Sequence, residues 1–158
     1  METARIQNAP VRGGGRVAWG RLVPAGLLAA VAAAVANALI YFAASGLGFI
    51  TQGFVIRMTS GEMPFTVGLV AITSVVGAVG AAVAFGVIGL FAQRPVRLFR
   101  IVAVVALALS FAMPLTIPGA PVAMVLSLEV MHVVAWAVIV GLLTTMARQA
   151  KAASAESQ

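Results

Sequence analysis

The sequence predicts an all-α fold, a transmembrane bundle of four helices with both termini in the cytoplasm. Hydrophobic residues make up 62% of the 158 residues and charged residues only 9%, whereas soluble domains carry about 25% charged residues. Residues 22–56, 63–93 and 101–128 contain no Asp, Glu, Lys or Arg. Because about 20 apolar residues cross the roughly 30 Å hydrocarbon layer as a helix, these stretches predict membrane spans and leave no room for a separate soluble domain.

The first predicted span covers residues 22–44 and follows a basic N-terminal arm, residues 1–21. Pro10 and the run Gly13–Gly15 interrupt the arm, and its polar composition predicts disorder. Arginines followed by an apolar run also fit a signal peptide, but this run of 23 residues exceeds the about 7–15 residues of a signal-peptide apolar region. We therefore expect the segment to be retained as a span.

The segment between the first two spans, residues 45–64, carries four glycines with Phe49, Ile50 and Phe54 between them. Apolar residues in such a stretch predict a loop that packs at the headgroup boundary. A re-entrant loop is the alternative, and its backbone would need cover from other parts of the protein.

The second predicted span, residues 65–91, is expected to be the central packing helix. Small residues recur four apart along it and let helix backbones approach closely, which is how membrane helices gain packing energy. The residues singled out for this packing are Gly77, Gly80, Ala81 and Gly86.

Two further spans are predicted at residues 96–113 and 122–146, followed by a polar tail, residues 147–158. Pro95 suits the first turn of a helix, where the missing N–H costs nothing. The stretch from Pro114 to Pro121 contains three prolines and a glycine. These are too many helix breakers for a regular helix, so the stretch predicts a tight turn between the last two spans.

The basic residues predict the orientation. Nine of them flank the spans on one side, and only Arg57 lies on the other. Cytoplasmic loops carry the excess of Lys and Arg, so both termini and the connection between the second and third spans are expected in the cytoplasm. The nine residues are Arg5, Arg12, Arg16, Arg21, Arg94, Arg97, Arg100, Arg148 and Lys151.

Glu129 and His132 are the polar residues of greatest interest inside the predicted spans. They lie three residues apart and so share a helix face. A carboxyl group in hydrocarbon costs about 2.5–3.5 kcal/mol on insertion scales and rarely faces lipid, so Glu129 is expected to point into the bundle. Depth in the membrane places further polar residues in the same outer half, and we expect one polar cluster of Glu129, His132, Asn37, Tyr41, Ser74 and Ser110.

Three roles are open for this cluster. Its members can satisfy one another and fix the helix register. Glu129 and His132 can bind a ligand or move protons, because intramembrane ionisable groups mark functional sites by default. Alternatively, His132 can ligate a haem or chlorophyll-type pigment. A di-iron site needs two Glu-x-x-His motifs and two more Glu; this chain has a single His, and we predict no metal site.

Enzyme activity is not expected. The sequence has no Cys and shows no paired carboxylates, Gly-x-Ser-x-Gly elbow or phosphate-cradling loop. Its formal charge of +6 comes from residues that flank the spans and form no basic patch with interleaved aromatics. Nucleic acid is therefore not an expected partner.

The stretch from residue 93 to residue 146 combines three motifs: a basic loop, Arg94-Pro95-Val96-Arg97-Leu98-Phe99; a span end, Ser110-Phe111-Ala112-Met113-Pro114-Leu115; and the pair Met131-His132. Together these motifs resemble a family of small four-helix bacterial membrane proteins of unknown function, over about the last two-thirds of the chain. The resemblance implies a bacterial inner-membrane location and four spans, and it supplies no activity.

We expect a non-enzymatic integral membrane protein, an accessory or packing subunit of a membrane assembly, because its Ala- and Gly-rich faces suit helix–helix contact. Its partners would be the lipid bilayer and other membrane helices, either from further copies or from different chains. The alternatives are a small carrier or ligand-binding protein that uses Glu129 and His132, and a pigment- or haem-ligating subunit through His132. The sequence does not determine a cofactor.

Overall fold

The computed structural model describes residues 17–58 and 61–148. Five helices are α1 (Trp19–Gly46), α2 (Val67–Phe91), α3 (Pro95–Ser110), α4 (Ala112–Leu115) and α5 (Val122–Arg148). Among the described residues, four helices are long and apolar enough to cross a membrane, with α3 and α4 together forming one of them as Pro95–Leu115. The protein is therefore mainly helical and has the spans of a membrane protein.

The helices lie close to the predicted spans and differ from them at the ends. α1 begins at Trp19, inside the predicted arm, and Val17 before it is buried with only 8% of its surface exposed. α3 gives way at Phe111 to the short α4, which contains Pro114. Residues 1–16 of the arm and 149–158 of the tail, with Arg5, Arg12, Arg16 and Lys151, lie outside the described residues.

The segment expected to be a loop contains two short strands, which form a β-hairpin. β1 (Val55–Met58) pairs antiparallel with β2 (Gly61–Pro64), so that Arg57 lies opposite Glu62. Gly61 adopts a φ of 137°, which L side chains rarely adopt, and Phe65 donates its N–H to the Phe54 carbonyl at 2.8 Å. A two-stranded hairpin is marginal by itself; this one is fixed by Ile56, which is buried in a cluster with residues of α1 and α5.

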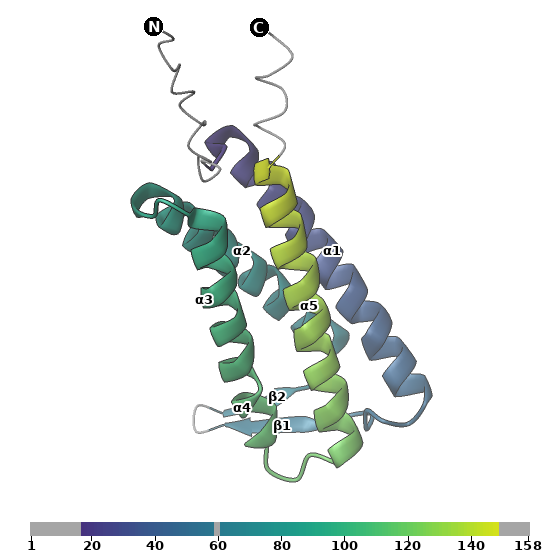
Figure 1. Cartoon of the computed structure of the whole chain (residues 1–158). Helices are drawn as coiled ribbons and strands as arrows, with labels where there is room; N and C mark the ends of the chain where they lie inside the picture. The colour runs from purple at the N-terminus through teal and green to yellow at the C-terminus, as the bar shows by residue number, and fades with distance from the viewer. Residues whose placement is uncertain (1–16, 59–60, 149–158) are drawn as a thin grey trace, which may run out of the picture.

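The helix ends fall into two groups (Figure 1). The first turn of α1, the α2–α3 connection and the last turn of α5 lie at one end, called here the basic end because it carries Arg21, Arg94 and Arg97. The hairpin, α4 and the turn before α5 lie at the opposite end, called the hairpin end. The chain thus begins and finishes its helical part at the same end, as an even number of spans requires.

α1 and α2 pack closely through small residues. A Cβ placed on Gly26 would lie 3.2 Å from the Ala82 Cβ, and one on Gly86 would lie 3.1 Å from Leu22 Cδ2. Ala81 is partly buried against the same core. In contrast, a Cβ on Gly77 or Gly80 would meet no described atom within 4 Å apart from its chain neighbours and the backbone of its own helix. Of the small residues singled out in the sequence, Gly86 and Ala81 therefore pack within the chain, and Gly77 and Gly80 are exposed.

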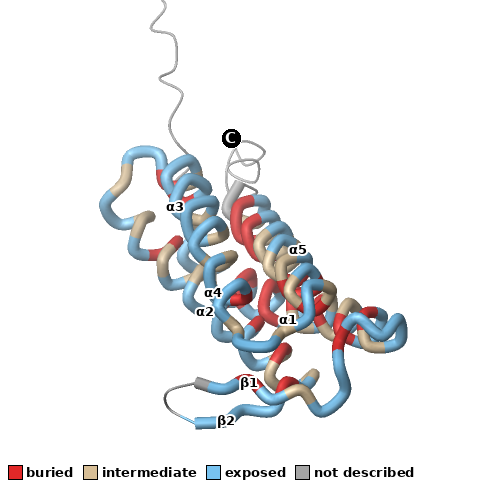
Figure 2. The backbone as a smooth tube through the Cα atoms, turned by 90° about the horizontal axis from the view of Figure 1, so that it is seen from below, coloured by how far each residue is buried: buried red, intermediate tan, exposed pale blue. Residues whose placement is uncertain are grey.

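The buried residues form two clusters, one towards each end. Towards the basic end, Phe85 and Phe99 pack with ring centroids 4.7 Å apart, together with the small residues of α1. Towards the hairpin end, Tyr41, Ile50 and Phe65 pack against methionines of α5. Figure 2 shows buried residues on α1 and α5, while α3 is mostly exposed.

α3 is anchored at one end only. Within Pro95–Ser110, only Pro95 and Phe99 are buried, both near its start. Arg100 contributes a further contact there, because its Nη2 lies 3.5 Å from the Thr144 Oγ1 of α5. Towards the hairpin end, α3 therefore has no buried residue to hold it against the other helices, and space remains beside α2 and α5.

Candidate functional site

A cavity of about 770 Å³ occupies this space at the hairpin end. Its walls come from α1, α2 and α5, from both strands of the hairpin, and from α4 with the turn that follows it. Thr73 and Gly77 of α2, and Met113 and Thr116 near α4, line the cavity and are themselves exposed. The cavity is therefore partly open to the outside.

Asn37 forms the polar part of the α1 wall. Only 5% of its surface is exposed, and its Nδ2 donates to Ser74 Oγ at 3.0 Å. Ser74 Oγ in turn donates to the Val70 carbonyl at 2.8 Å, so the hydroxyl offers Asn37 a lone pair. This fixes the orientation of the amide. Asn37 Oδ1 is then left buried, without a hydrogen-bond partner among the described residues.

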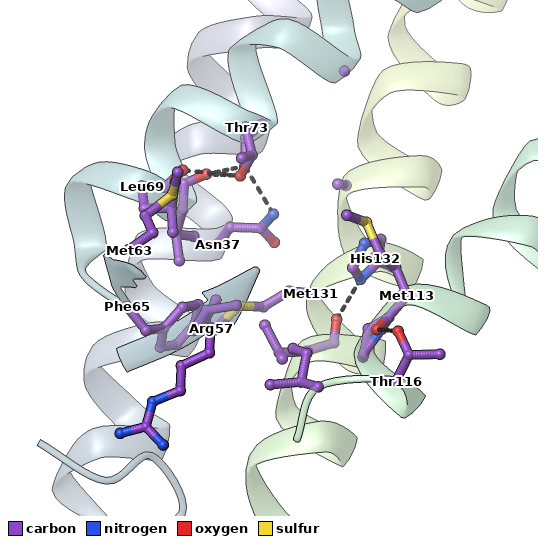
Figure 3. Close-up of a pocket in the computed structure, with 18 of the residues that line it drawn as sticks. Asn37, Arg57, Met63, Phe65, Leu69, Thr73, Met113, Thr116, Met131 and His132 are labelled. Atoms are coloured by element: carbon purple, nitrogen blue, oxygen red, sulfur yellow. Dashed lines mark hydrogen bonds between the residues drawn. The ribbon is translucent and has the colours of Figure 1, made fainter. Parts of the chain in front are cut away.

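His132 lies on the opposite wall and comes from α5 (Figure 3). Its Nδ1 is 2.7 Å from the Leu128 carbonyl oxygen. A carbonyl oxygen can only accept, so Nδ1 must carry the hydrogen. In the neutral ring, Nε2 is then an acceptor. The backbone of the preceding turn of α5 thus selects the tautomer of the neutral ring.

Two further hydroxyls lie on the cavity wall. Thr73 Oγ1 donates to the carbonyls of Leu69 or Val70, at 2.9 and 3.1 Å. Thr116 Oγ1 donates to the Met113 carbonyl at 2.8 Å. In both cases the single hydroxyl hydrogen is used within the local backbone, and only lone pairs remain for another molecule.

The rest of the lining is mainly apolar, and Arg57 is its one charged residue among those described. Arg57 Nε lies 3.2 Å from Glu62 Oε1 across the hairpin, and both side chains are well exposed. Figure 3 shows the guanidinium turned away from the cavity. An ion pair this exposed contributes about 0–1 kcal/mol, so it adds little to the stability of the protein. Arg57 and Glu62 mark the mouth of the cavity.

The structure brings together part of the predicted polar cluster. Asn37, Ser74 and His132 line the cavity. Tyr41 instead donates its hydroxyl to the Phe65 carbonyl, at a long 3.5 Å. Ser110 donates to the Leu107 carbonyl one turn earlier in its own helix, at 2.7 Å, and does not line the cavity.

Glu129 is not among the residues that line the cavity. Both of its carboxylate oxygens are buried and have no hydrogen-bond partner among the described residues. Trp136 lies seven residues further along α5, and its Nε1 is likewise buried without a partner. These two residues lie about 20° apart around the helix axis, so α5 carries two buried polar groups without partners on one side, next to His132.

The remaining lining residues could hardly be predicted from the sequence. The hairpin contributes Ile56, Arg57 and Met63, and the turn after α4 contributes Thr116 and Ile117. The available signal was that segment 45–64 and the Pro-rich turn are rich in apolar residues, whereas exposed loops are normally polar. No group of three or more His, Cys, Asp or Glu residues that could hold a metal ion occurs in the part of the chain that the structure describes.

Comparison with known proteins places this chain in a family. The model of a family of unknown function, DUF6069, matches residues 17–149, which is most of the chain. The chain belongs to DUF6069. The match spans all four candidate membrane helices and every residue that lines the cavity of this DUF6069 protein. No curated protein and no solved structure matches the chain.

Proposed function

We propose that this protein is a non-enzymatic, multi-pass membrane protein that binds a small, mainly apolar molecule in the cavity between α1, α2 and α5. The observation that carries the proposal is the cavity itself. Its volume of about 770 Å³ lies within the range of about 300–1,000 Å³ typical of ligand sites. Such sites combine an apolar lining with a few polar groups that converge on the ligand, and Asn37 and His132 supply those groups here.

The hydrogen bonds of the cavity wall support a binding role over a catalytic one. A serine or threonine nucleophile requires a base that accepts its proton. The hydroxyls of Thr73, Ser74 and Thr116 all donate to backbone carbonyls. His132 is likewise bonded to the backbone of its own helix. Among the described residues, the cavity therefore offers no activated nucleophile.

The proposed setting is a four-helix bundle in a bacterial inner membrane, with the basic end in the cytoplasm. The support is the positive-inside rule. Arg21, Arg94, Arg97 and Arg100 belong to the basic end, and α5 ends there at Arg148. In this orientation the cavity lies in the outer half of the membrane and the hairpin faces the periplasm.

Gly77 and Gly80 provide a matched test of this function. Both are exposed residues of α2 with free space around the Cβ position, but only Gly77 lines the cavity. We expect wild-type protein purified in mild detergent to carry a small molecule detectable by mass spectrometry. Gly77→Phe should reduce the bound amount at least about tenfold because it fills part of the site, while Gly80→Phe should retain it. Equal loading of the two variants, or an empty wild-type protein, would contradict the proposal.

An accessory role in a larger membrane assembly is a second candidate. The observation that favours it is the exposed position of Gly80, where another helix could approach closely. Pigment or haem ligation through His132 also stays a prediction, supported by the Nε2 atom that the Leu128 hydrogen bond leaves available. For a carrier, the structure favours Asn37 over Glu129 as the partner of His132, because Asn37 and His132 line the same cavity.

A further inference from the structure

Three arginines lie close together at the start of α3, at the basic end. Arg94 directly precedes the first residue of the helix, Pro95, and Arg97 and Arg100 follow at intervals of three residues. All three arginines are exposed. Residues three apart on a helix have Cβ atoms about 5–6 Å apart, and like charges at such spacing repel each other. An anion that contacts two of these arginines would relieve the repulsion.

The described carboxylates do not offset this charge. Glu62 and Glu129 are the acidic residues in the part of the chain that the structure describes. Glu62 belongs to the hairpin, and Glu129 lies seven residues after the start of α5, which is at the hairpin end. The described ion pair joins Arg57 to Glu62 across the hairpin. The arginines of α3 therefore have no counter-ion among the described residues.

Arg97 faces away from the helices that pack against α3. The buried residues of α3 are Pro95 and Phe99. Arg97 lies two residues from each of them, which places it about 160° around the helix axis from both. Its side chain is therefore directed to the outside of the bundle, where a membrane protein meets lipid. A long cationic side chain near the end of a span reaches the headgroup region.

Arg100 lies on the side of α3 that is next to α5. Its Nη2 lies 3.5 Å from Thr144 Oγ1. Thr144 donates its own hydrogen to the Val140 carbonyl at 2.7 Å, so its oxygen can accept from Arg100. A guanidinium has five N–H donors, and this contact uses one of them. The contact thus holds the guanidinium one helical turn from Arg97, and such groups bind phosphate through two parallel N–H···O bonds.

We infer that Arg97 and Arg100, with Arg94 beside them, bind the phosphate of an anionic phospholipid at the basic end. This site is separate from the cavity and does not depend on the proposed binding function. Depth argues for a lipid, because headgroup phosphates lie where these exposed side chains end. A basic residue near an anionic membrane surface contributes about 1 kcal/mol, which is a factor of about five in affinity.

Lipid binding to the full chain in mild detergent tests this inference. Phosphatidylglycerol and phosphatidylcholine with the same acyl chains are added at equal concentrations, and the bound lipids are counted by native mass spectrometry. Both lipids contain a phosphate, but only phosphatidylglycerol carries a net negative charge. We expect the wild-type protein to prefer phosphatidylglycerol at least about tenfold. The preference should fall as the salt concentration is raised, because salt screens exposed charges.

Variants with the same loss of charge then locate the site. Arg97→Gln should lower the preference about fivefold, as expected for one arginine, and the double variant with Arg100→Gln should bring it close to one. Because Arg97 is exposed, its replacement should not disturb the fold, whereas Arg100→Gln also removes the Thr144 contact. Arg21→Gln is the control and should keep the preference. Arg21 is also exposed at the basic end, but it lies on α1 and lines a small pocket with Phe85 and Leu143.

The outcomes distinguish a site on α3 from general attraction. A preference that Arg97→Gln lowers and Arg21→Gln retains supports the site. No preference in the wild-type protein, or an equal loss in the two single variants, would overturn it. Displacement of the bound lipid by millimolar glycerol phosphate would assign the arginines to a soluble phosphate compound and would also overturn the lipid. None of these results affects the cavity, whose function Gly77→Phe tests independently.

Discussion

Glu129 holds a buried carboxyl group whose oxygens lack hydrogen-bond partners among the described residues. Burying a polar group without a partner costs about 1–3 kcal/mol by mutational measures. We therefore predict that Glu129→Leu raises the free energy of unfolding by about 1–3 kcal/mol, measured by SDS titration in detergent micelles. Trp136→Phe is the companion variant, since it removes the other unpartnered atom on this face. A loss of stability in Glu129→Leu would show that the carboxyl has a partner in the membrane.

The same residue shows how far a sequence can specify a site. Position along each span was enough to place Asn37, Ser74 and His132 at one depth, and all three line the cavity. Depth does not specify rotation about a helix axis, which depends on packing against other helices. Glu129 is three residues from His132, yet only His132 lines the cavity. Ser110 likewise bonds within α3, because α3 is not held against the other helices at that end.

At the scale of elements, close packing of α1 on α2 depends on the absence of side chains at a few positions. Gly26 is the clearest case, because a Cβ there would lie 3.2 Å from the Ala82 Cβ, an atom fixed to the α2 backbone. We predict that Gly26→Leu lowers the free energy of unfolding by about 1–3 kcal/mol, as overpacking does elsewhere. Gly80→Leu should have little effect in the isolated protein, since its Cβ meets no described atom. Equal effects of the two substitutions in the SDS titration would contradict this packing.

The four long helices and the short hairpin were not equally predictable. A helix that crosses hydrocarbon must satisfy its backbone within itself, so long charge-free stretches were sufficient to predict the spans. The strands of the hairpin have four residues each and are stabilised by distant residues, since Ile56 packs in a cluster with Tyr41 of α1 and Met124 of α5. Its strands therefore have no strong local signal, and segment 45–64 was expected to be a loop.

This dependence of the hairpin on Ile56 can be tested by hydrogen exchange. Ile56 is 8% exposed and Val55, its neighbour on the opposite face, is 38% exposed. Ile56→Ser should weaken docking of the hairpin by about 2 kcal/mol, the value of one buried aliphatic side chain. The strand amides should then exchange faster while the amides of α2 stay protected. Val55→Ser should change the exchange rates much less, and equally fast exchange in both variants would mean that the hairpin is held in another way.

For the molecule as a whole, lipid as the solvent explains the unusual distribution of burial. Residues such as Leu109 and Phe91 are 70% and 83% exposed, and in water such a surface would mark an interaction site or an aggregation risk. In a membrane it is the normal outer surface of a helix. Because lipid tails do not drive helices together, α3 can remain attached mainly near its start, where Pro95 and Phe99 are buried, and the cavity beside it can stay open.

The orientation of the whole molecule follows from the same reasoning and can be tested directly, because the chain contains no Cys. Gln52 lies at the hairpin end and Gln93 in the α2–α3 connection at the basic end, and both are exposed. In intact bacterial spheroplasts, a membrane-impermeant maleimide should label Gln52→Cys. Gln93→Cys should react only after permeabilisation, since the positive-inside rule predicts that the end carrying Arg94, Arg97 and Arg100 faces the cytoplasm. Labelling of Gln93→Cys from outside would reverse the orientation and place the cavity in the cytoplasmic half, where its ligand would come from inside the cell.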